Sequence, residues 1–234
     1  MIRKASCVVA MTGAGASTNA GIPDFRGPNG IYASGRYSQR VFDIEQFRRD
    51  PGEFFRFTRD LFTAIGHIAP TPSHRLLADW EARGLIAGVI TQNIDPLHAL
   101  AGSRNVLAVH GSYALAHCQS CGREFAYEQF ARMVFEADVP RCPCSARSVI
   151  KPDVVFFGEA VRDFEAAHAL ACRCDLMLVL GSSLAVQPAA LLPQLVNGDV
   201  VIVNRGESAL PKSPRRHFVQ AEVDAFMAAV EERL

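Results

Sequence analysis

Short apolar runs that alternate with helical segments constrain the fold of this chain more than any other feature. Five runs rich in Val, Ile and Leu are mostly apolar rather than alternating, which is typical of strands buried on both faces of a parallel sheet. Helical segments separate them, so we predict an α/β fold with a doubly wound, Rossmann-like parallel sheet. The expected strands are 5–12, 85–90, 106–109, 175–180 and 199–203, and the expected helices are 73–83, 160–173 and 222–234.

Two stretches interrupt this alternation. Residues 16–40 contain several glycines and prolines, which predicts a long loop after the first strand. A loop of this length inside a compact domain is usually functional. Residues 113–150 contain four cysteines and predict a small inserted module, completed by helices within residues 41–70.

Composition and charge exclude several classes of protein. Of the 234 residues, 49% are apolar and 21% are charged, as in ordinary globular proteins. The 24 basic and 24 acidic residues give no net charge, so we expect neither nucleic acid nor a membrane as a partner. No targeting or bilayer-spanning segment is visible, and an odd number of cysteines suits a reducing compartment. We therefore predict a cytoplasmic protein.

Two glycines, Gly13 and Gly15, directly follow the first expected strand. This arrangement is typical of dinucleotide-binding loops, in which glycines let the backbone approach a pyrophosphate and the next helix offers its N-terminal amides. The third glycine of that pattern would fall at position 18, which is Thr18. By itself, the loop is equally consistent with a simple turn between a strand and a helix.

Further motifs extend this loop. Gly13-Ala14-Gly15-Ala16-Ser17 continues into Gly21-Ile22-Pro23-Asp24-Phe25-Arg26, and in both motifs the chain resembles the sirtuins, the NAD-dependent protein deacylases. The resemblance implies NAD as co-substrate and acetylated lysine side chains of proteins as the other substrate. It recurs in order at Thr91-Gln92-Asn93-Ile94-Asp95 with Leu97-His98, Val109-His110-Gly111, the cysteine pairs, Phe156-Phe157-Gly158-Glu159, Gly181-Ser182-Ser183-Leu184 and 201–204.

The resemblance also implies which residues contact NAD. The Ile94 backbone and Asp95 would hold the nicotinamide amide, and Asn93 would order the ribose and a nearby water. Without the resemblance, Asp95 followed by Pro96 indicates a helix N-cap with proline at the first helical position, and both roles can hold at once. The implied NAD-binding residues are Gly13, Ala14, Gly15, Ser17, Asp24, Phe25, Arg26, Gln92, Asn93, Ile94, Asp95, Gly181, Ser182, Ser183, Asn204 and Gly206.

His110 ends an apolar run, so we place its imidazole at the end of a strand. An imidazole with a pKa near ~6.5 can accept a proton at neutral pH, although a lone histidine at a strand end is usually structural. The resemblance implies that His110, with Asn93, is catalytic. After the acyl-lysine oxygen attacks the anomeric carbon, His110 would deprotonate a ribose hydroxyl, which closes on the acyl carbon. Nicotinamide, free lysine and an O-acyl-ADP-ribose would be released. We expect the other histidines to be solvated or to pack in the core.

Residues 154–159 form a short apolar segment that predicts extended backbone. The resemblance makes this segment the edge that a substrate peptide joins by β-augmentation, with an apolar tunnel for the lysine stem. Sirtuins that remove succinyl or malonyl groups carry a Tyr and an Arg where this chain has Phe55 and Thr58, so we expect acetyl or another neutral acyl group. The implied substrate-binding residues are Val155, Phe156, Phe157, Gly158 and Glu159.

The four clustered cysteines predict a structural zinc site. Cys118-x-x-Cys121 is followed after twenty residues by Cys142-x-Cys144, and four thiolates leave no open position for catalysis. The second pair is one residue shorter than usual, which predicts a tighter knuckle, with His117 as a candidate substitute ligand. Four free thiols in a loop are the alternative. We expect the remaining cysteines to be small buried hydrophobes, namely Cys7, Cys172 and Cys174.

These observations predict an NAD-dependent protein lysine deacetylase. Residues 1–40, 71–112 and 151–234 would form the NAD-binding domain, and residues 41–70 with 113–150 the small helical and zinc-binding module. A mono-ADP-ribosyltransferase that uses the same NAD site stays open. A nicotinamide dehydrogenase would normally have the third glycine of the loop and an acidic residue at the end of the second strand, and neither is evident in this chain. A non-catalytic NAD-sensing zinc module is disfavoured by the presence of Asn93, Asp95 and His110.

Overall fold

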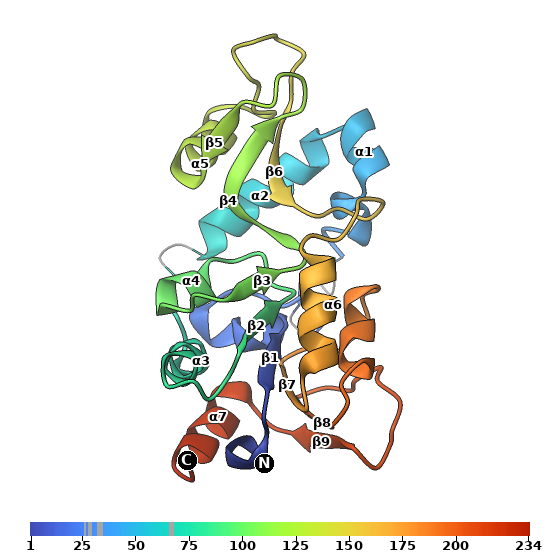
Figure 1. The fold of residues 1–234 in the computed structure, drawn as a ribbon. Coiled ribbons are helices and arrows are strands. Elements are labelled where there is room, and N and C mark those ends of the chain that lie inside the picture. Colours follow the sequence, from blue (N-terminus) through green and yellow to red (C-terminus); the bar gives the residue numbers. More distant parts are fainter. Residues whose placement is uncertain (26, 28–29, 32–34, 66–67) are drawn as a thin grey trace.

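A sheet of six parallel strands forms the larger part of the molecule (Figure 1). The computed structural model describes residues 1–25, 27, 30–31, 35–65 and 68–234. The strand order is β3-β2-β1-β7-β8-β9, which confirms the predicted α/β class. The strands are β1 (Val8–Thr12), β2 (Gly88–Thr91), β3 (Val106–Ala108), β7 (Leu176–Leu180), β8 (Asp199–Asn204) and β9 (Arg216–Gln220).

Helices cover both faces of this sheet, as the apolar runs predict. On one face, Val8 and Ala10 of β1 share a buried cluster with Trp80 of α3 (Pro72–Ala82), and α7 (Val223–Glu231) packs beside it. On the other face, Val9 and Met11 share a cluster with side chains of α6 (Phe164–Arg173). Successive residues of a strand point to opposite faces, so a strand covered on both sides needs an apolar residue at every position.

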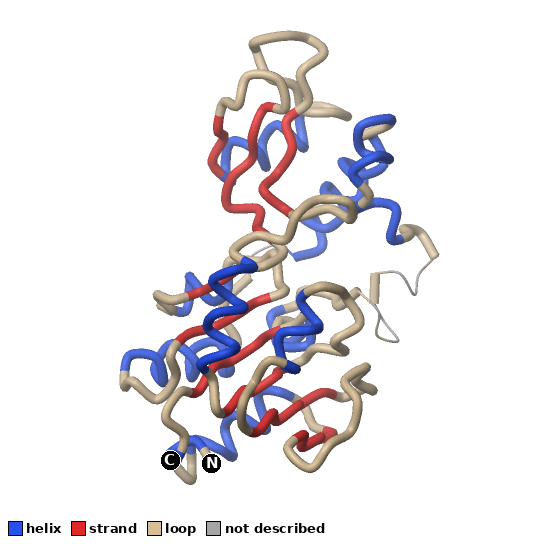
Figure 2. Tube along the Cα trace, turned by 45° about the vertical axis from the view of Figure 1, so that its right-hand side comes forward, coloured by secondary structure: helices blue, strands red, loops and turns tan. Residues whose placement is uncertain are grey.

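A second, antiparallel sheet of three strands lies apart from the first one (Figure 2). Its core is a cluster of edge-to-face aromatic rings, among them Phe42, Phe54 and Phe156. This cluster joins side chains from residues 41–62 with side chains from residues 113–156, although they are far apart in the sequence. The elements here are β4 (Gly111–Cys118), β5 (Glu124–Ala126), β6 (Ile150–Val154), α1 (Ile44–Arg49), α2 (Gly52–Ile65) and α5 (Tyr127–Glu136).

Some of these elements differ from the sequence predictions. The second sheet and α5 lie where only a cysteine-rich module was expected, and α6 begins at Phe164 rather than at residue 160. Strand β9 was not predicted, because an edge strand that is largely exposed carries no apolar run. Within the described residues, no helix combines the length and apolar character that a membrane crossing requires.

The strand order reverses between β1 and β7. The strands β2 and β3 lie on one side of this pair, and β8 and β9 lie on the other. In open α/β sheets, ligands bind in the crevice beyond the carboxyl ends of the strands at such a point. The loops that follow β1 and β7 meet there, since the amides of Gly13 and Gly15 donate to the carbonyls of Leu180 and Gly181, each at 2.9 Å.

Candidate active site

A cavity of about 950 Å³ opens at this reversal point, beyond the ends of β1, β2 and β7. Its volume is at the upper end of the range for small-molecule sites. Gly13, Ser17 and Asp95 lie behind its wall, and Arg26 lies outside the described residues. The other predicted residues line it: Ala14, Gly15, Asp24, Phe25, Gln92, Asn93, Ile94, His110, Val155, Phe156, Phe157, Gly158, Glu159, Gly181, Ser182, Ser183, Asn204 and Gly206.

The glycines at the base of the cavity allow two loops to touch. A Cβ atom on Gly13 would lie 2.8 Å from the carbonyl oxygen of Gly181. A Cβ atom on Gly15 would lie 2.8 Å from the Cα of Gly181. Gly181 has a φ of +66°, a left-handed conformation that favours glycine, and a side chain there would collide with the backbone of Ala16. The loops therefore pack backbone against backbone, which leaves room beside them for a ligand.

His110 is a half-buried residue on the cavity wall. Its Nδ1 lies 2.9 Å from the carbonyl oxygen of Gln92. A carbonyl oxygen only accepts, so Nδ1 carries the hydrogen and the lone pair of the neutral ring is on Nε2. The carbonyl of His110 in turn accepts the Val155 amide at 2.9 Å. This tautomer suits a general base, and its backbone is tied to the predicted substrate segment.

The side chains of Gln92 and Asn93 are held in defined orientations. Asn93 Nδ2 donates to the carbonyl of Gly13 at 3.1 Å and to Ser17 Oγ at 3.0 Å, so the group that Asn93 can offer a ligand is the acceptor Oδ1. Ser182 Oγ donates to Gln92 Oε1 at 3.0 Å. The Nε2 of Gln92 is buried and, among the described residues, has no partner.

A buried donor without a partner costs about 1–3 kcal/mol, so the Gln92 amide indicates an acceptor supplied by a ligand. The hydroxyls and phosphates of NAD are acceptors of this kind. The close approach of the two glycine loops also suits a pyrophosphate that binds to backbone amides. The residues present therefore fit NAD.

Asp95 interacts with the protein through both carboxylate oxygens. Ser17 Oγ donates to Oδ2 at 2.8 Å, and the Leu97 amide donates to Oδ1 at 3.0 Å. The prediction that Asp95 is the helix N-cap with Pro96 at the first helical position is wrong, because the short helix α4 (Leu97–Ala101) has Pro96 as its N-cap and Asp95 lies one residue before it. Asp95 and Ser17 together hold the amide of Asn93 from behind the cavity wall.

A buried lysine that the sequence analysis missed holds the predicted substrate segment. Lys151 is 6% exposed, and its Nζ lies 2.9 Å from Glu159 Oε2 and 4.2 Å from the centre of the Phe156 ring. Its Nζ also donates to the Val154 carbonyl at 2.8 Å. Burial lowers the pKa of Lys151, and Glu159 acts in the opposite direction. Asp153 gives β6 a second charged residue, so the sequence carries no local signal that Lys151 is buried.

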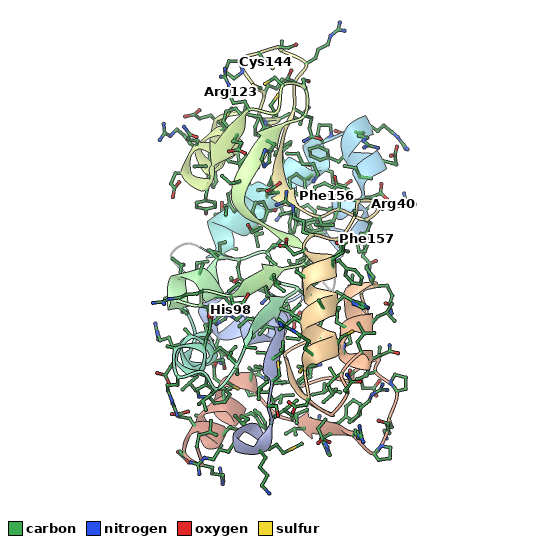
Figure 3. The ribbon with its side chains drawn as sticks, viewed as in Figure 1. Arg40, His98, Arg123, Cys144, Phe156 and Phe157 are labelled. Atoms are coloured by element: carbon green, nitrogen blue, oxygen red, sulfur yellow. The ribbon has the colours of Figure 1, made fainter. Side chains whose placement is uncertain are left out.

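The same segment already pairs with another part of the chain. The Phe157 amide donates to the Phe42 carbonyl at 2.6 Å, and the Ile44 amide donates to the Phe157 carbonyl at 3.1 Å. Figure 3 shows Phe156 and Phe157 at the junction of the two sheets, where Phe156 is buried and Phe157 is 42% exposed. Because the amide and the carbonyl of Phe157 are both already hydrogen-bonded within the chain, a substrate peptide would have to form its backbone hydrogen bonds with neighbouring residues of the segment.

The four predicted zinc ligands converge at the far end of the second sheet. The sulfur atoms of Cys118, Cys121, Cys142 and Cys144 all lie within 4.8 Å of one another. Two of the separations are 3.6 Å, for Cys118 and Cys144, and 3.8 Å, for Cys121 and Cys142. A tetrahedron with Zn–S bonds of about 2.3 Å has edges of about 3.8 Å, so the four thiols fit zinc despite the short second pair.

Hydrogen bonds around the sulfurs also suit a metal. The amides of Cys121 and Ser120 donate to Cys118 Sγ, which lowers the pKa of that thiol to about 6 and favours the thiolate that zinc requires. His117 is not a substitute ligand, because its Nε2 lies 3.2 Å from Asp153 Oδ1 and the residue lies outside the described cluster of metal-ligating groups.

The other three cysteines only partly follow the prediction. Cys174 is buried, and burial raises the pKa of its thiol to about 12. Cys7 and Cys172 are half-buried rather than buried, because they lie at the ends of a strand and a helix and not within the core.

Comparisons with known proteins agree with this geometry. A family model described as "Sir2 family" matches residues 13–188. The NAD-dependent protein deacetylase of Thermotoga maritima is 45% identical over 89% of this chain and 85% of its own length. A solved Sir2 variant with a deacetylated p53 peptide and 3′-O-acetyl-ADP-ribose has a TM-score of 0.93 and 41% identity, covering 99% of this chain and 95% of its own. Sir2Tm bound to a propionylated peptide has a TM-score of 0.88 and 39% identity, covering 99% and 94%.

Proposed function

The chain belongs to the Sir2 family, and we propose that it is an NAD-dependent protein-lysine deacetylase. It would transfer the acyl group of an acetylated lysine to ADP-ribose, releasing nicotinamide and O-acetyl-ADP-ribose. The observation that carries this proposal is His110. Its Nδ1–H donates to the Gln92 carbonyl, so the lone pair of the neutral ring is on Nε2. The residue lines the cavity. The acetyl-ADP-ribose and peptide in the related solved structure support the same reaction.

The protein's own side chains would act in three ways. NAD supplies the ribosyl carbon that receives the acyl oxygen. His110 Nε2 accepts a proton from a ribose hydroxyl, and Asn93 Oδ1 accepts a hydrogen bond from the ribose or from an ordered water. Gln92 Nε2 donates to the co-substrate and so gains the partner that it lacks among the described residues. The aromatic rings of Phe25 and Phe156 line the cavity and limit the access of water.

We propose acetyl or another neutral acyl group as the preferred modification. Phe55 and Thr58 are buried and do not line the cavity, and Thr58 Oγ1 donates to the Phe54 carbonyl at 2.9 Å. Among the described lining residues, the only lysine or arginine is Arg205, which adjoins Asn204 at the end of β8. No fixed cation of the described wall is thus available beside His110 for a succinyl carboxylate. Sir2Tm accepts a propionylated peptide in a solved structure, which supports this preference.

The organisation of the chain follows from this proposal. Residues 1–40, 71–112 and 151–234 would be the NAD-binding domain, and 41–70 with 113–150 would be the small module, whose four cysteines hold structural zinc. Acetylated proteins would be the partners, and nucleic acid would not be bound directly. We also propose a cytoplasmic location, which is supported by the absence of a disulfide at any of the seven cysteines, all of which lie within the described residues.

The test is mass spectrometry of an acetylated peptide after incubation with NAD and the protein. O-acetyl-ADP-ribose formed in amounts equal to the deacetylated peptide is expected. ADP-ribosylated protein would instead support the transferase alternative, and no product would support the non-catalytic one. His110→Ala should abolish the product, while the matched control His168→Ala, which changes an exposed histidine of α6, should retain it. A succinylated peptide assayed in parallel should react much more slowly, and a clear succinyl preference would contradict the neutral-acyl proposal.

A further inference from the structure

Two buried histidines lie behind the wall of the NAD cavity, and the mechanism above does not use them. His74 on α3 and His98 on α4 are 0% and 3% exposed, and their ring centres are 4.6 Å apart. Figure 3 labels His98 within the body that contains the six-stranded sheet. Neither residue lines the cavity. Buried polar rings of this kind are rare unless hydrogen bonds hold them, so their partners indicate their role.

A chain of hydrogen bonds connects His98 to Asn93. His98 Nε2 lies 2.8 Å from Thr12 Oγ1, at the end of β1. Thr12 Oγ1 donates to Thr91 Oγ1 at 2.8 Å, at the end of β2. Thr91 Oγ1 also accepts the backbone amide of Asn93 at 3.0 Å. Every atom in this chain is buried, so water cannot replace a missing partner at low cost.

The direction of these bonds fixes the tautomer of His98. Thr12 has one hydroxyl hydrogen and gives it to Thr91, so it can only accept from His98. His98 Nε2 must therefore carry a hydrogen, and the lone pair of its neutral ring is on Nδ1. In agreement with this tautomer, His98 Nδ1 is buried and has no donor or acceptor among the described residues. Burial lowers the pKa of His98 to about 3, which keeps the ring neutral at physiological pH.

His74 supports the same arrangement from the other side. Its Nδ1 lies 2.8 Å from Thr71 Oγ1, and Thr71 Oγ1 lies 3.4 Å from the carbonyl oxygen of Ala16 in the loop after β1. The two imidazoles thus reach the two segments that shape the cavity indirectly, His74 through the hydroxyl of Thr71 and His98 through those of Thr12 and Thr91.

We propose that His98 is a positioning residue for Asn93, acting through the hydroxyls of Thr12 and Thr91. The side-chain amide of Asn93 donates to the Gly13 carbonyl and to Ser17 Oγ, and its backbone amide donates to Thr91 Oγ1. Loss of the Thr91 contact would remove one of the hydrogen bonds that orient the segment 92–94, so that Asn93 Oδ1 and Gln92 Nε2 would meet NAD in a poorer geometry. The expected effect on catalysis rests on the proposed function.

The test compares Thr12→Val, which removes the hydroxyl at nearly constant volume, with Thr12→Ser, which keeps it. We expect Thr12→Val to raise the KM for NAD and to lower kcat/KM for NAD by about tenfold, the effect of one lost buried hydrogen bond. The KM for acetyl-peptide should stay unchanged, and Thr12→Ser should remain within about twofold of the native protein. A purely structural loss would lower the active fraction, and thus kcat, without changing the KM for NAD.

A second pair of variants acts on the histidine itself. His98→Gln retains an N–H donor within reach of Thr12 and should be mild, whereas His98→Leu should resemble Thr12→Val. Equal KM values for NAD in Thr12→Val and the native protein would overturn the proposal, as would equal impairment in Thr12→Ser and Thr12→Val. Calorimetric titration with NAD measures the NAD affinities of the same variants without turnover. Absence of deacetylase activity would therefore refute the proposed function, and the calorimetric affinities would still test the role of His98.

Discussion

Burial of His98 makes the stability of the folded protein depend on pH in a direction that can be worked out. The desolvated ring, with His74 beside it, has a pKa lowered from 6.5 to about 3. In the unfolded chain the pKa returns to its ordinary value. Between these two values, the unfolded state binds a proton that the folded state does not, so the free energy of unfolding falls as the pH falls.

The size of this effect follows from the two pKa values. Between about pH 7 and about pH 5, protonation of the unfolded chain at His98 should remove about 2 kcal/mol from the free energy of unfolding. The loss is complete below about pH 3, where the folded ring is protonated as well, and it then amounts to about 5 kcal/mol. A change of 2 kcal/mol is a substantial part of the stability of a typical domain.

The assay is urea unfolding of the native protein and of His98→Gln at about pH 7, 6 and 5. Glutamine does not titrate, so the stability of the variant relative to the native protein should rise by about 2 kcal/mol over this range. Groups far from His98 contribute equally in the two proteins, whereas the substitution also changes the surroundings of the neighbouring His74, whose pKa is lowered by burial. Parallel pH profiles for the two proteins would refute the reasoning, as would an NMR signal of the folded His98 ring that titrates near pH 6.

Three further predictions concern other parts of the molecule. Lys151→Met should destabilise the fold by about 1 kcal/mol in chemical unfolding, because the Glu159 side chain that it leaves is 30% exposed and still accepts from the Phe156 amide, and should raise the KM for peptide more than that for NAD; an unchanged peptide KM would show that the ion pair does not position the substrate segment. Gly181→Ala should cost about 3 kcal/mol and abolish calorimetric NAD binding, because its Cβ collides with Ala16; normal NAD affinity would contradict this. Metal analysis should find one zinc per chain, and a chelator should lower the melting temperature, whereas Cys144→Ser should bind zinc more weakly; full stability in chelator would argue against a structural metal.

The parts of this fold that depend on local patterns could be predicted from the sequence. The central strands β1, β2 and β7 are buried at every position and apolar except where β1 and β2 end in threonine, because both faces are covered, and the cysteine spacing is a local signal of a metal site. Strand β9 was missed because it lies at the edge of the sheet and is largely exposed. Polar residues such as Arg216 and His217 are therefore tolerated there, and the strand has no apolar run that would predict it. The antiparallel pairing of β4 and β6 depends on contacts between distant segments and leaves no such local pattern.

In the candidate site too, the residues in local motifs could be predicted, and those that depend on distant contacts could not. The strand-end motifs identified the part of the cavity lining that follows β1, β2, β7 and β8, since the carboxyl ends of parallel strands meet at one edge of a sheet. The role of His98 could not be predicted, because its partner Thr12 is 86 residues away and its neighbour His74 is on another helix. Lys151 was missed for a similar reason, since its burial depends on the aromatic cluster that the distant residues 42–62 supply.

The contact between the loops after β1 and β7 has a consequence for biosynthesis. Gly13 and Gly181 touch at the base of the cavity, yet 167 of the 234 residues lie between them in the sequence. An emerging chain therefore cannot bind NAD until β7 and its loop have left the ribosome, even when the first strands and the glycine motif have been available for some time. NAD can then stabilise only chains that have joined both loops, so the cellular pool of co-substrate would favour complete molecules over truncated ones.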